Sequence, residues 1–100
     1  MDNIIKIAKE LRKLYDESYN IYKSIVDNII NNQIKDINLI ENTLDNILGI
    51  YTDKGFNLFV KLCTYYETVN KENAMFYFNF LKEEREEEYK IYVKKKKYSQ

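Results

Sequence analysis

Apolar and polar positions follow the period of an α-helix along most of this chain. In the first third, apolar residues recur at spacings of three and four, which predicts one amphipathic helix from Asn3 to Ile30. Asp2 or Asn3 is the expected N-cap, because short polar side chains accept hydrogen bonds from the first free amides of a helix. The stripe consists of Ile4, Ile7, Ala8, Leu11, Leu14, Tyr15, Tyr22, Ile25 and Ile29, widened by Ile21 and Val26.

The first predicted helix is long for a chain of 100 residues. At about 1.5 Å per residue it would measure about 42 Å, whereas a compact domain of this size is roughly 35 Å across. The candidate break is Asp16-Glu17-Ser18, because Ser18 places a polar group on the apolar stripe. We expect the unbroken helix, which then either overhangs the rest of the chain or packs against a second copy.

Two turns and a second helix are expected in the middle of the chain. Residues 28–33 include three asparagines and predict the first turn, since asparagine tolerates left-handed backbone geometry. The second helix carries apolar residues from Ile37 to Tyr51, and Gly49 weakens its last turn without ending it. Residues 52–55 predict the next turn, in which Gly55 supplies a permissive backbone.

Two more helices complete the pattern. The third spans Phe56–Val69, and the fourth begins near Lys71 with Asn70 as its N-cap. The apolar face of the third helix is formed by Phe56, Phe59, Val60, Leu62, Cys63, Tyr66 and Val69. That of the fourth carries Ala74, Phe78, Leu81, Arg85 and Tyr89. We expect Phe59 and Phe78 to be core residues.

These four segments predict an all-α fold, an antiparallel four-helix bundle with a long first helix. We expect residues 1–93 to form a single helical domain. Residues 94–100 are expected to be a basic tail that frays.

Composition argues against catalysis. The chain has no histidine and one cysteine, so Cys63 lacks the usual base that would deprotonate it. Its neighbours are apolar, and we expect a buried, inert thiol. The glutamates within residues 83–88 point around one helix, whereas metal ligands must converge. We therefore expect no enzyme activity, no metal and no cofactor.

The charge balance makes nucleic-acid binding a secondary alternative. Sixteen basic and sixteen acidic residues give a formal charge of zero, and only two of the basic residues are arginines. The one concentrated basic feature consists of Lys94, Lys95, Lys96 and Lys97. It is either an anion contact or a solubilising tail that balances the glutamates upstream.

Hydropathy predicts a cytoplasmic chain without a membrane span. No stretch reaches the eighteen or so apolar residues that a span needs. The first residues do not form a signal-peptide pattern either, since Lys6, Lys9, Glu10 and Arg12 interrupt the apolar positions.

Aromatic residues are concentrated in the second half of the chain. Eleven of the fifteen follow Tyr51, which is more than one helix–helix seam readily buries. Most must belong to the core, and the remainder, drawn from Tyr65, Phe76 and Phe80, would form an exposed partner surface. Together with the long first helix, this surplus predicts self-association as a homodimer.

A resemblance adds to this interpretation. Residues 55–59, 61–66, 70–74 and 76–77 resemble a pattern in small uncharacterised helical proteins of AT-rich Gram-positive bacteria and their conjugative transposons. The resemblance covers about residues 44–81 and implies no activity and no site residues. In architecture the chain is also similar to bacteriocin immunity proteins, which are cytoplasmic helical bundles of this length with a charged C-terminal tail.

Taken together, these observations predict a small, non-catalytic accessory or regulatory protein that acts through protein–protein contacts and is encoded on a mobile element. The alternatives are a nucleic-acid-binding regulator that uses the lysine tail, and a bacteriocin-immunity-like bundle. The identity of the protein partner is left open.

Overall fold

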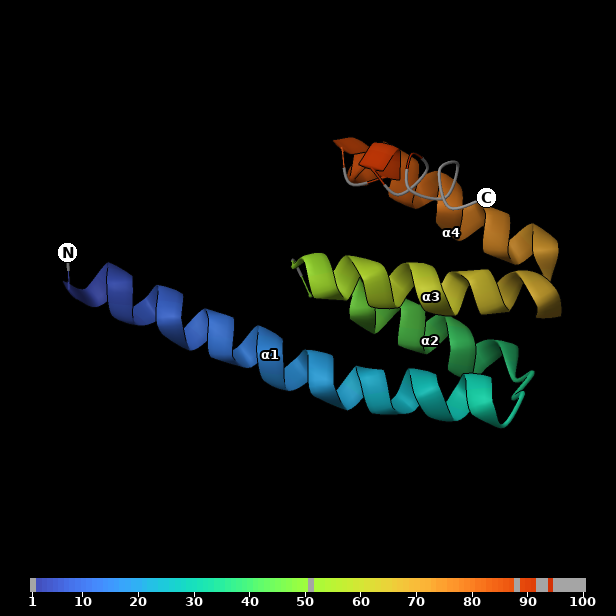
Figure 1. Cartoon of the computed structure of the whole chain (residues 1–100), viewed down its shortest axis with the longest axis horizontal. Helices are drawn as coiled ribbons and strands as arrows, with labels where there is room; N and C mark the ends of the chain where they lie inside the picture. The colour runs from blue at the N-terminus through green and yellow to red at the C-terminus, as the bar shows by residue number, and fades with distance from the viewer. Residues whose placement is uncertain (1, 51, 88, 92–93, 95–100) are drawn as a thin grey trace. The chain divides into compact units, whose positions relative to one another are not determined.

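A computed structural model describes residues 2–50, 52–87, 89–91 and 94, and the regular structure in these residues is helical. Four helices follow one another in Figure 1: α1 (Asp2–Asn31), α2 (Ile37–Ile47), α3 (Asp53–Val69) and α4 (Lys71–Glu84). The predicted all-α class with a long first helix is confirmed. The chain forms two compact units, residues 1–62 and 63–100, and their boundary falls within α3.

Helix α1 is continuous over its 30 residues and does not break at Ser18. Its sequence contains neither glycine nor proline, and a serine hydroxyl can be tolerated on a helix surface at small cost. At about 1.5 Å per residue, α1 is about 45 Å long. The expectation of an unbroken first helix is therefore confirmed.

Helix α1 ends in a Schellman motif within the predicted turn. The amide of Ile34 donates to the carbonyl of Ile29 at 2.9 Å, and the amide of Gln33 donates to that of Ile30 at 3.1 Å. Gln33 has the left-handed backbone that closes this motif, with φ of 51°. The predicted turn, residues 28–33, was only partly right, because α1 continues to Asn31 and the turn begins at Asn32. The left-handed residue is a glutamine and none of the three asparagines.

Helix α2 is shorter than the sequence predicts. Asp36 caps it, since its carboxylate accepts a hydrogen bond from the amide of Leu39 at 3.2 Å. The helix ends at Ile47, so Gly49 lies beyond the helix instead of in its last turn. The amide of Gly49 bonds to the carbonyl of Asn46, three residues back, which is the tighter spacing typical of a helix end.

Helix α3 begins earlier than predicted, at Asp53. Thr52 is its N-cap, because the hydroxyl of Thr52 accepts from the amide of Gly55 at 3.1 Å. Gly55 is thus part of the first helical turn and does not have a positive φ. A Cβ at this position would lie 2.8 Å from Cγ2 of Ile50. The glycine is needed for close approach of the preceding loop, and the prediction of a permissive turn was wrong.

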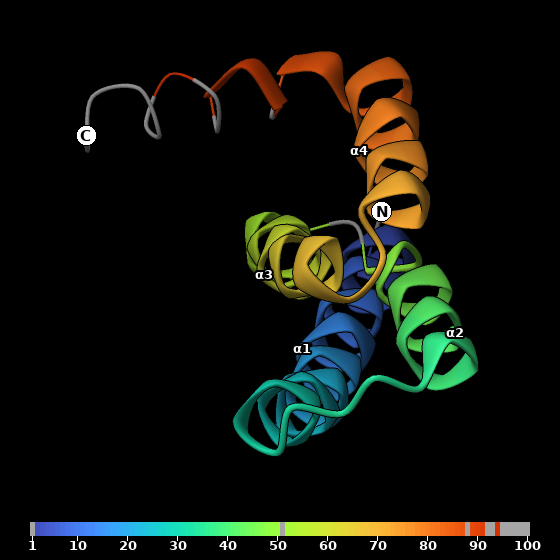
Figure 2. The same cartoon turned by 90° about the vertical axis from the view of Figure 1, so that its right-hand side faces the viewer.

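In the unit formed by residues 1–62, α2 and the first part of α3 pack on the C-terminal half of α1 (Figure 2). Two contacts fix the direction of α3. The ammonium of Lys54 lies 5.7 Å from the ring centre of Tyr19, and Lys61 pairs with Asp27. Because the residue numbers of both partners increase from the first contact to the second, α1 and α3 run in the same direction. The core of this unit consists of Val26, Ile29, Ile40, Leu44, Ile47, Ile50, Phe56, Leu58, Phe59, Val60 and Leu62.

In the unit formed by residues 63–100, Asn70 caps α4 as predicted. Its side chain accepts a hydrogen bond from the amide of Asn73 at 3.0 Å. The helix ends at Glu84, because Arg85 has a non-helical backbone with φ of −132° and ψ of 55°. Residues 86–87, 89–91 and 94 are helical again. The predicted apolar face is therefore interrupted at Arg85 and does not continue to Tyr89 in one helix.

The burial along α4 also differs from the sequence pattern. Ala74 and Leu81 are buried, whereas Phe78 is only half-buried. Phe59 on α3 is fully buried, as expected. The placement of Phe78 in the core was therefore only partly right.

Candidate interaction surface

The most extensive exposed apolar feature of the described residues lies along α1. Six of the twelve large apolar side chains that are exposed belong to this helix, namely Ile4, Ile5, Ile7, Leu11, Leu14 and Ile21, and they are 46% to 72% exposed. Five of them, together with Ser18, form a row with spacings of three and four. We call this row, Ile4, Ile7, Leu11, Leu14, Ser18 and Ile21, the α1 seam. Such spacing is that of the contact positions of a coiled coil.

The seam is open because α1 extends past the helices that pack on it. Lys54, in the first turn of α3, contacts Tyr19, so α3 begins near the level of Tyr19. Figure 1 shows the N-terminal part of α1 extending past α2 and the start of α3. Residues 3–17 make up about 22 Å of the helix at 1.5 Å per residue. Val26 and Ile29 continue the same apolar stripe and are completely buried. The stripe is one surface, of which only the C-terminal part is covered.

Charged side chains of both signs border the seam. Glu10 and Glu17 lie next to it on one flank, and Lys6 and Lys13 lie one step further around the helix. The opposite flank is mostly apolar or aromatic, with Ile5, Ala8, Tyr15, Tyr19 and Tyr22, and it also carries Arg12. Tyr15, Tyr19 and Tyr22 are half-buried. The surface offered to a partner is thus an apolar strip with one alternating charged border.

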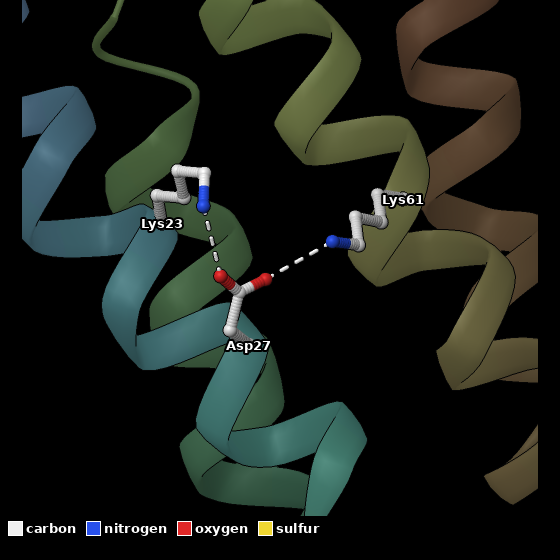
Figure 3. A network of polar contacts seen from close by, with 3 residues as sticks. All are labelled: Lys23, Asp27 and Lys61. Carbon is white, nitrogen blue, oxygen red and sulfur yellow. Dashed lines mark hydrogen bonds and ion pairs between the residues drawn. The ribbon is translucent and has the colours of Figure 1, made fainter.

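Asp27 marks the packed half of α1. Its carboxylate forms ion pairs with Lys23, one turn earlier on the same helix, and with Lys61 of α3, both at 3.0 Å (Figure 3). The hydrogen bond from Lys61, followed by that from Lys23, lowers the pKa of Asp27. All three side chains remain accessible to solvent. This network links α3 to α1.

Cys63 is buried, as the sequence predicts. Its thiol donates to the carbonyl of Ala74 at 3.4 Å, which joins α3 to α4 within the second unit. Burial, and secondarily the negative charge of Glu67, raises the pKa of the Cys63 thiol to about 12. A thiol with such a pKa is protonated at neutral pH, which makes it a poor nucleophile. Its inertness towards thiol reagents remains a prediction.

The aromatic side chains of the second unit divide into packed and exposed groups. Tyr66 is completely buried, and its hydroxyl accepts a hydrogen bond from the side-chain amide of Asn73 at 3.1 Å. Its ring meets that of Tyr77 edge-on, with centres 6.4 Å apart. In contrast, Phe76 is 72% exposed and Phe80 is 40% exposed. Tyr66 and Tyr77 therefore supply packing between α3 and α4.

The three residues predicted as a partner surface are in different surroundings. Phe76 and Phe80 lie one helical turn apart on α4 and share a face of that helix. Met75 is also exposed beside them. Tyr65, on α3, is half-buried. The structure thus brings two of the three predicted residues together. The residues of the α1 seam were not among the predicted site residues, although their regular spacing is visible in the sequence.

The predicted anion contact lies mostly outside the residues that the structure describes. Lys94 is exposed, and Lys95, Lys96 and Lys97 lie outside the described residues. Among the positions that are described, no three cysteine or carboxylate side chains are grouped as metal ligands would be. Within the same positions, no helix has both the length and the apolar character needed to cross a bilayer.

No family model, curated protein or solved structure matches this chain. The resemblance to small helical proteins of Gram-positive bacteria therefore stays a prediction from the residues quoted above.

Proposed function

We propose that this chain is a small, non-catalytic accessory or regulatory protein that acts by binding another protein through the α1 seam. The occupant that suits the seam is an amphipathic helix, because contact rows spaced by three and four residues pack against a helix with a row of the same kind. The observation that carries the proposal is the exposure of the row on a helix that projects beyond its own bundle.

The size of the exposed surface supports a functional contact. Scattered apolar residues on a protein surface are normal, whereas a contiguous apolar patch of several hundred Å² marks a binding site more often. The five isoleucine and leucine side chains of the α1 seam, each exposing on the order of 100 Å² of apolar surface, form such a patch. Leaving it in water would also favour aggregation, which a specific partner prevents.

A protein partner suits the seam better than a membrane surface. Interfacial helices carry lysine and arginine along their polar face and bury bulky side chains among lipid chains. The projecting part of α1 does carry Lys6, Lys9, Arg12 and Lys13, but Glu10 and Glu17 border the seam directly. An anionic lipid surface would repel these two carboxylates. A protein partner can place a lysine against each of them.

Other parts of the proposal depend on sequence arguments. The closure of the four helices into an antiparallel bundle is inferred from their short connections. A cytoplasmic location follows from the hydropathy of the chain, and an origin on a mobile element follows from the resemblance over residues 44–81.

The proposal can be tested by photo-crosslinking in cells that make the protein. A photoreactive amino acid at Leu11, within the seam, should form a covalent adduct with one protein species. The same amino acid at Lys9, which lies on the opposite face of α1, is the matched control and should form none. Vesicles with and without anionic lipid test the competing interpretation, since a membrane-binding helix would sediment with the anionic vesicles.

Two results would contradict the proposal. The first is equal crosslinking at Leu11 and Lys9, which would mean that the seam has no preferred occupant. The second is retention by anionic vesicles together with the absence of a protein adduct at Leu11.

A further inference from the structure

We infer that the occupant of the α1 seam is a helix of a different protein, which carries basic residues along the border that faces Glu10 and Glu17. This inference rests on the proposed function and names the chemistry of the partner. The competing occupant is a second copy of this chain, and the charges beside the seam decide between the two.

The residues that border the seam differ on its two sides. The seam follows a seven-residue repeat, because its spacings alternate between three and four. In paired helices of this kind, the positions next to the contact row face the partner's border and set the choice of partner. One border of the seam consists of Glu10 and Glu17, and the other consists of Ala8, Tyr15 and Tyr22. The seam therefore has one acidic and one uncharged border.

Both border glutamates are accessible to a cation from a partner. Their side chains are exposed, and neither forms an ion pair in the described contacts of the chain. Lys6 and Lys13 lie further around α1, so a helix on the seam meets the carboxylates before it meets these ammonium groups. A lysine or arginine opposite each glutamate would add two attractive contacts to the apolar row.

A second copy of this chain supplies no cation at these places. In an antiparallel pair the acidic borders of the two copies face each other, so Glu10 lies against Glu17 of the second copy. The two-fold symmetry repeats this repulsion. In a parallel pair the acidic border faces the uncharged border instead, and the glutamates gain nothing. The acidic border thus favours a partner with a different sequence.

The packed half of α1 limits the length of the partner helix. The seam extends from Ile4 to Ile21, about 26 Å at about 1.5 Å per residue. Val26 and Ile29 continue the stripe but are completely buried, so a partner cannot follow it to them. A helix of about 18 residues covers the open row, and its two basic residues lie seven positions apart, like Glu10 and Glu17.

The first experiment measures the binding of two synthetic peptides to the full chain by calorimetry. Each peptide is about 21 residues long, three seven-residue repeats with isoleucine and leucine at the contact positions. The basic peptide has lysine at both borders and the acidic peptide has glutamate there, so neither pairs with itself. The basic peptide should bind about tenfold more tightly at low salt, and this preference should shrink at high salt.

A single charge reversal tests whether the border causes this preference. Glu17→Lys replaces one attractive contact by a repulsive one, and it should bring the affinities of the two peptides within about threefold of each other. The matched control, Asp16→Lys, makes the same change of charge one residue earlier, on the far face of α1. It should keep most of the preference. Lysine is a good helix former, so α1 stays helical in both variants.

The second experiment identifies the chemistry of the partner in cells. The adduct formed by a photoreactive amino acid at Leu11 is digested, and the crosslinked peptide is sequenced by mass spectrometry. The partner segment should belong to a different protein. It should contain an apolar row with spacings of three and four, bordered by two lysines or arginines seven positions apart.

The outcomes separate this inference from the proposed function. Failure of both peptides to bind, equal affinities for the two peptides, or equal effects of Glu17→Lys and Asp16→Lys would overturn the inference. An adduct between two copies of this chain would overturn it as well. If Leu11 crosslinks to one other protein whose segment lacks a basic border, the inference fails and the proposed function stands. If Leu11 gives no protein adduct, both fail.

Discussion

Residues 3–17 and residues 18–31 of α1 continue one apolar stripe, yet the second part is packed and the first part is open to solvent. Ile29 is completely buried and Ile4 is 72% exposed, although both lie on the same side of the helix. The difference arises from what lies alongside each part. Within the unit formed by residues 1–62, α1 is accompanied by an 11-residue α2 and the first part of α3, which are too short to cover a helix of about 45 Å.

A helical period of apolar residues defines one face of a helix without defining what packs on that face. The packed half of α1 has four additional devices that hold it in place: the Schellman motif at Gln33, the capped start of α2, the ion pairs of Asp27 and the contact of Lys54 with Tyr19. The open half has none of these in the described contacts. The helical structure of the open half must be stabilised in solution by the packed half, which continues the same helix, or by a partner.

The largest expected contrast is between Ile29→Ala and Ile4→Ala. Truncating Ile29 deletes buried methyl groups and leaves a cavity, and it should lower the free energy of unfolding by about 2–5 kcal/mol. Truncating Ile4 should change this free energy by less than about 0.5 kcal/mol at dilutions where the chain is monomeric. Urea denaturation followed by circular dichroism measures both. Equal losses in the dilute samples would mean that the two halves of α1 do not differ in coverage.

Hydrogen exchange should show the same contrast without any substitution. An isolated helical segment of about fifteen residues is marginal in water, so the amides of residues 7–17 should exchange much faster than those of residues 20–31 in dilute solution. Raising the protein concentration should protect residues 7–17 selectively if a second copy covers them. Uniform protection along α1 at high dilution would contradict the comparison.

The end of the packed half can be strengthened through Gln33. A non-glycine residue in the left-handed conformation is strained, so Gln33→Gly should raise the free energy of unfolding by about 0.5–1 kcal/mol. Gln33→Ala keeps a Cβ in the same conformation and should give no such gain. Thermal or urea unfolding of the two variants distinguishes them. A loss of stability in Gln33→Gly would show that the Schellman motif does not persist in solution.

The smallest expected effect concerns Asp27, whose ion pairs are exposed. Asp27→Asn should lower the unfolding midpoint slightly at low ionic strength, and the difference from the wild type should vanish at high salt. Because folding lowers the pKa of Asp27, its contribution is present above the ordinary pKa of an aspartate. That contribution is lost as the pH falls through the lowered value in the folded state. Unfolding measured between neutral and acidic pH at two salt concentrations checks both dependences.

Local features of the fold were largely predictable from the sequence. The continuous α1, the cap at Asn70 and the burial of Cys63 follow from spacing and from the identity of nearby residues. The errors occurred where backbone geometry depends on contacts. Gly55 looked like a turn residue, but it is needed because Ile50 approaches the first turn of α3. Arg85 ends α4 although the helical period continues past it, and no local signal marks this break.

The candidate surface was predictable only in part. Phe76 and Phe80 were selected from their aromatic density and are exposed. The sequence predicted that the first helix would overhang the rest of the chain or pack against a second copy, but it did not indicate which residues of the stripe would be exposed. Periodicity cannot separate the two cases, since a buried face and a docking face have the same pattern.

The pattern of residues along the chain is enough to predict that it is helical, that α1 is long and amphipathic, and which side of α1 is apolar. These properties depend on residues three and four positions apart, whose interactions are local. The part of that apolar side that is covered follows from the packing of the helices. Coverage depends on where α2 ends and where α3 begins, and both are set by contacts between residues distant in sequence, such as Tyr19 with Lys54 and Asp27 with Lys61. Burial depends on how the assembled helices pack, whereas the tendency of a side chain to be buried depends on the residue alone.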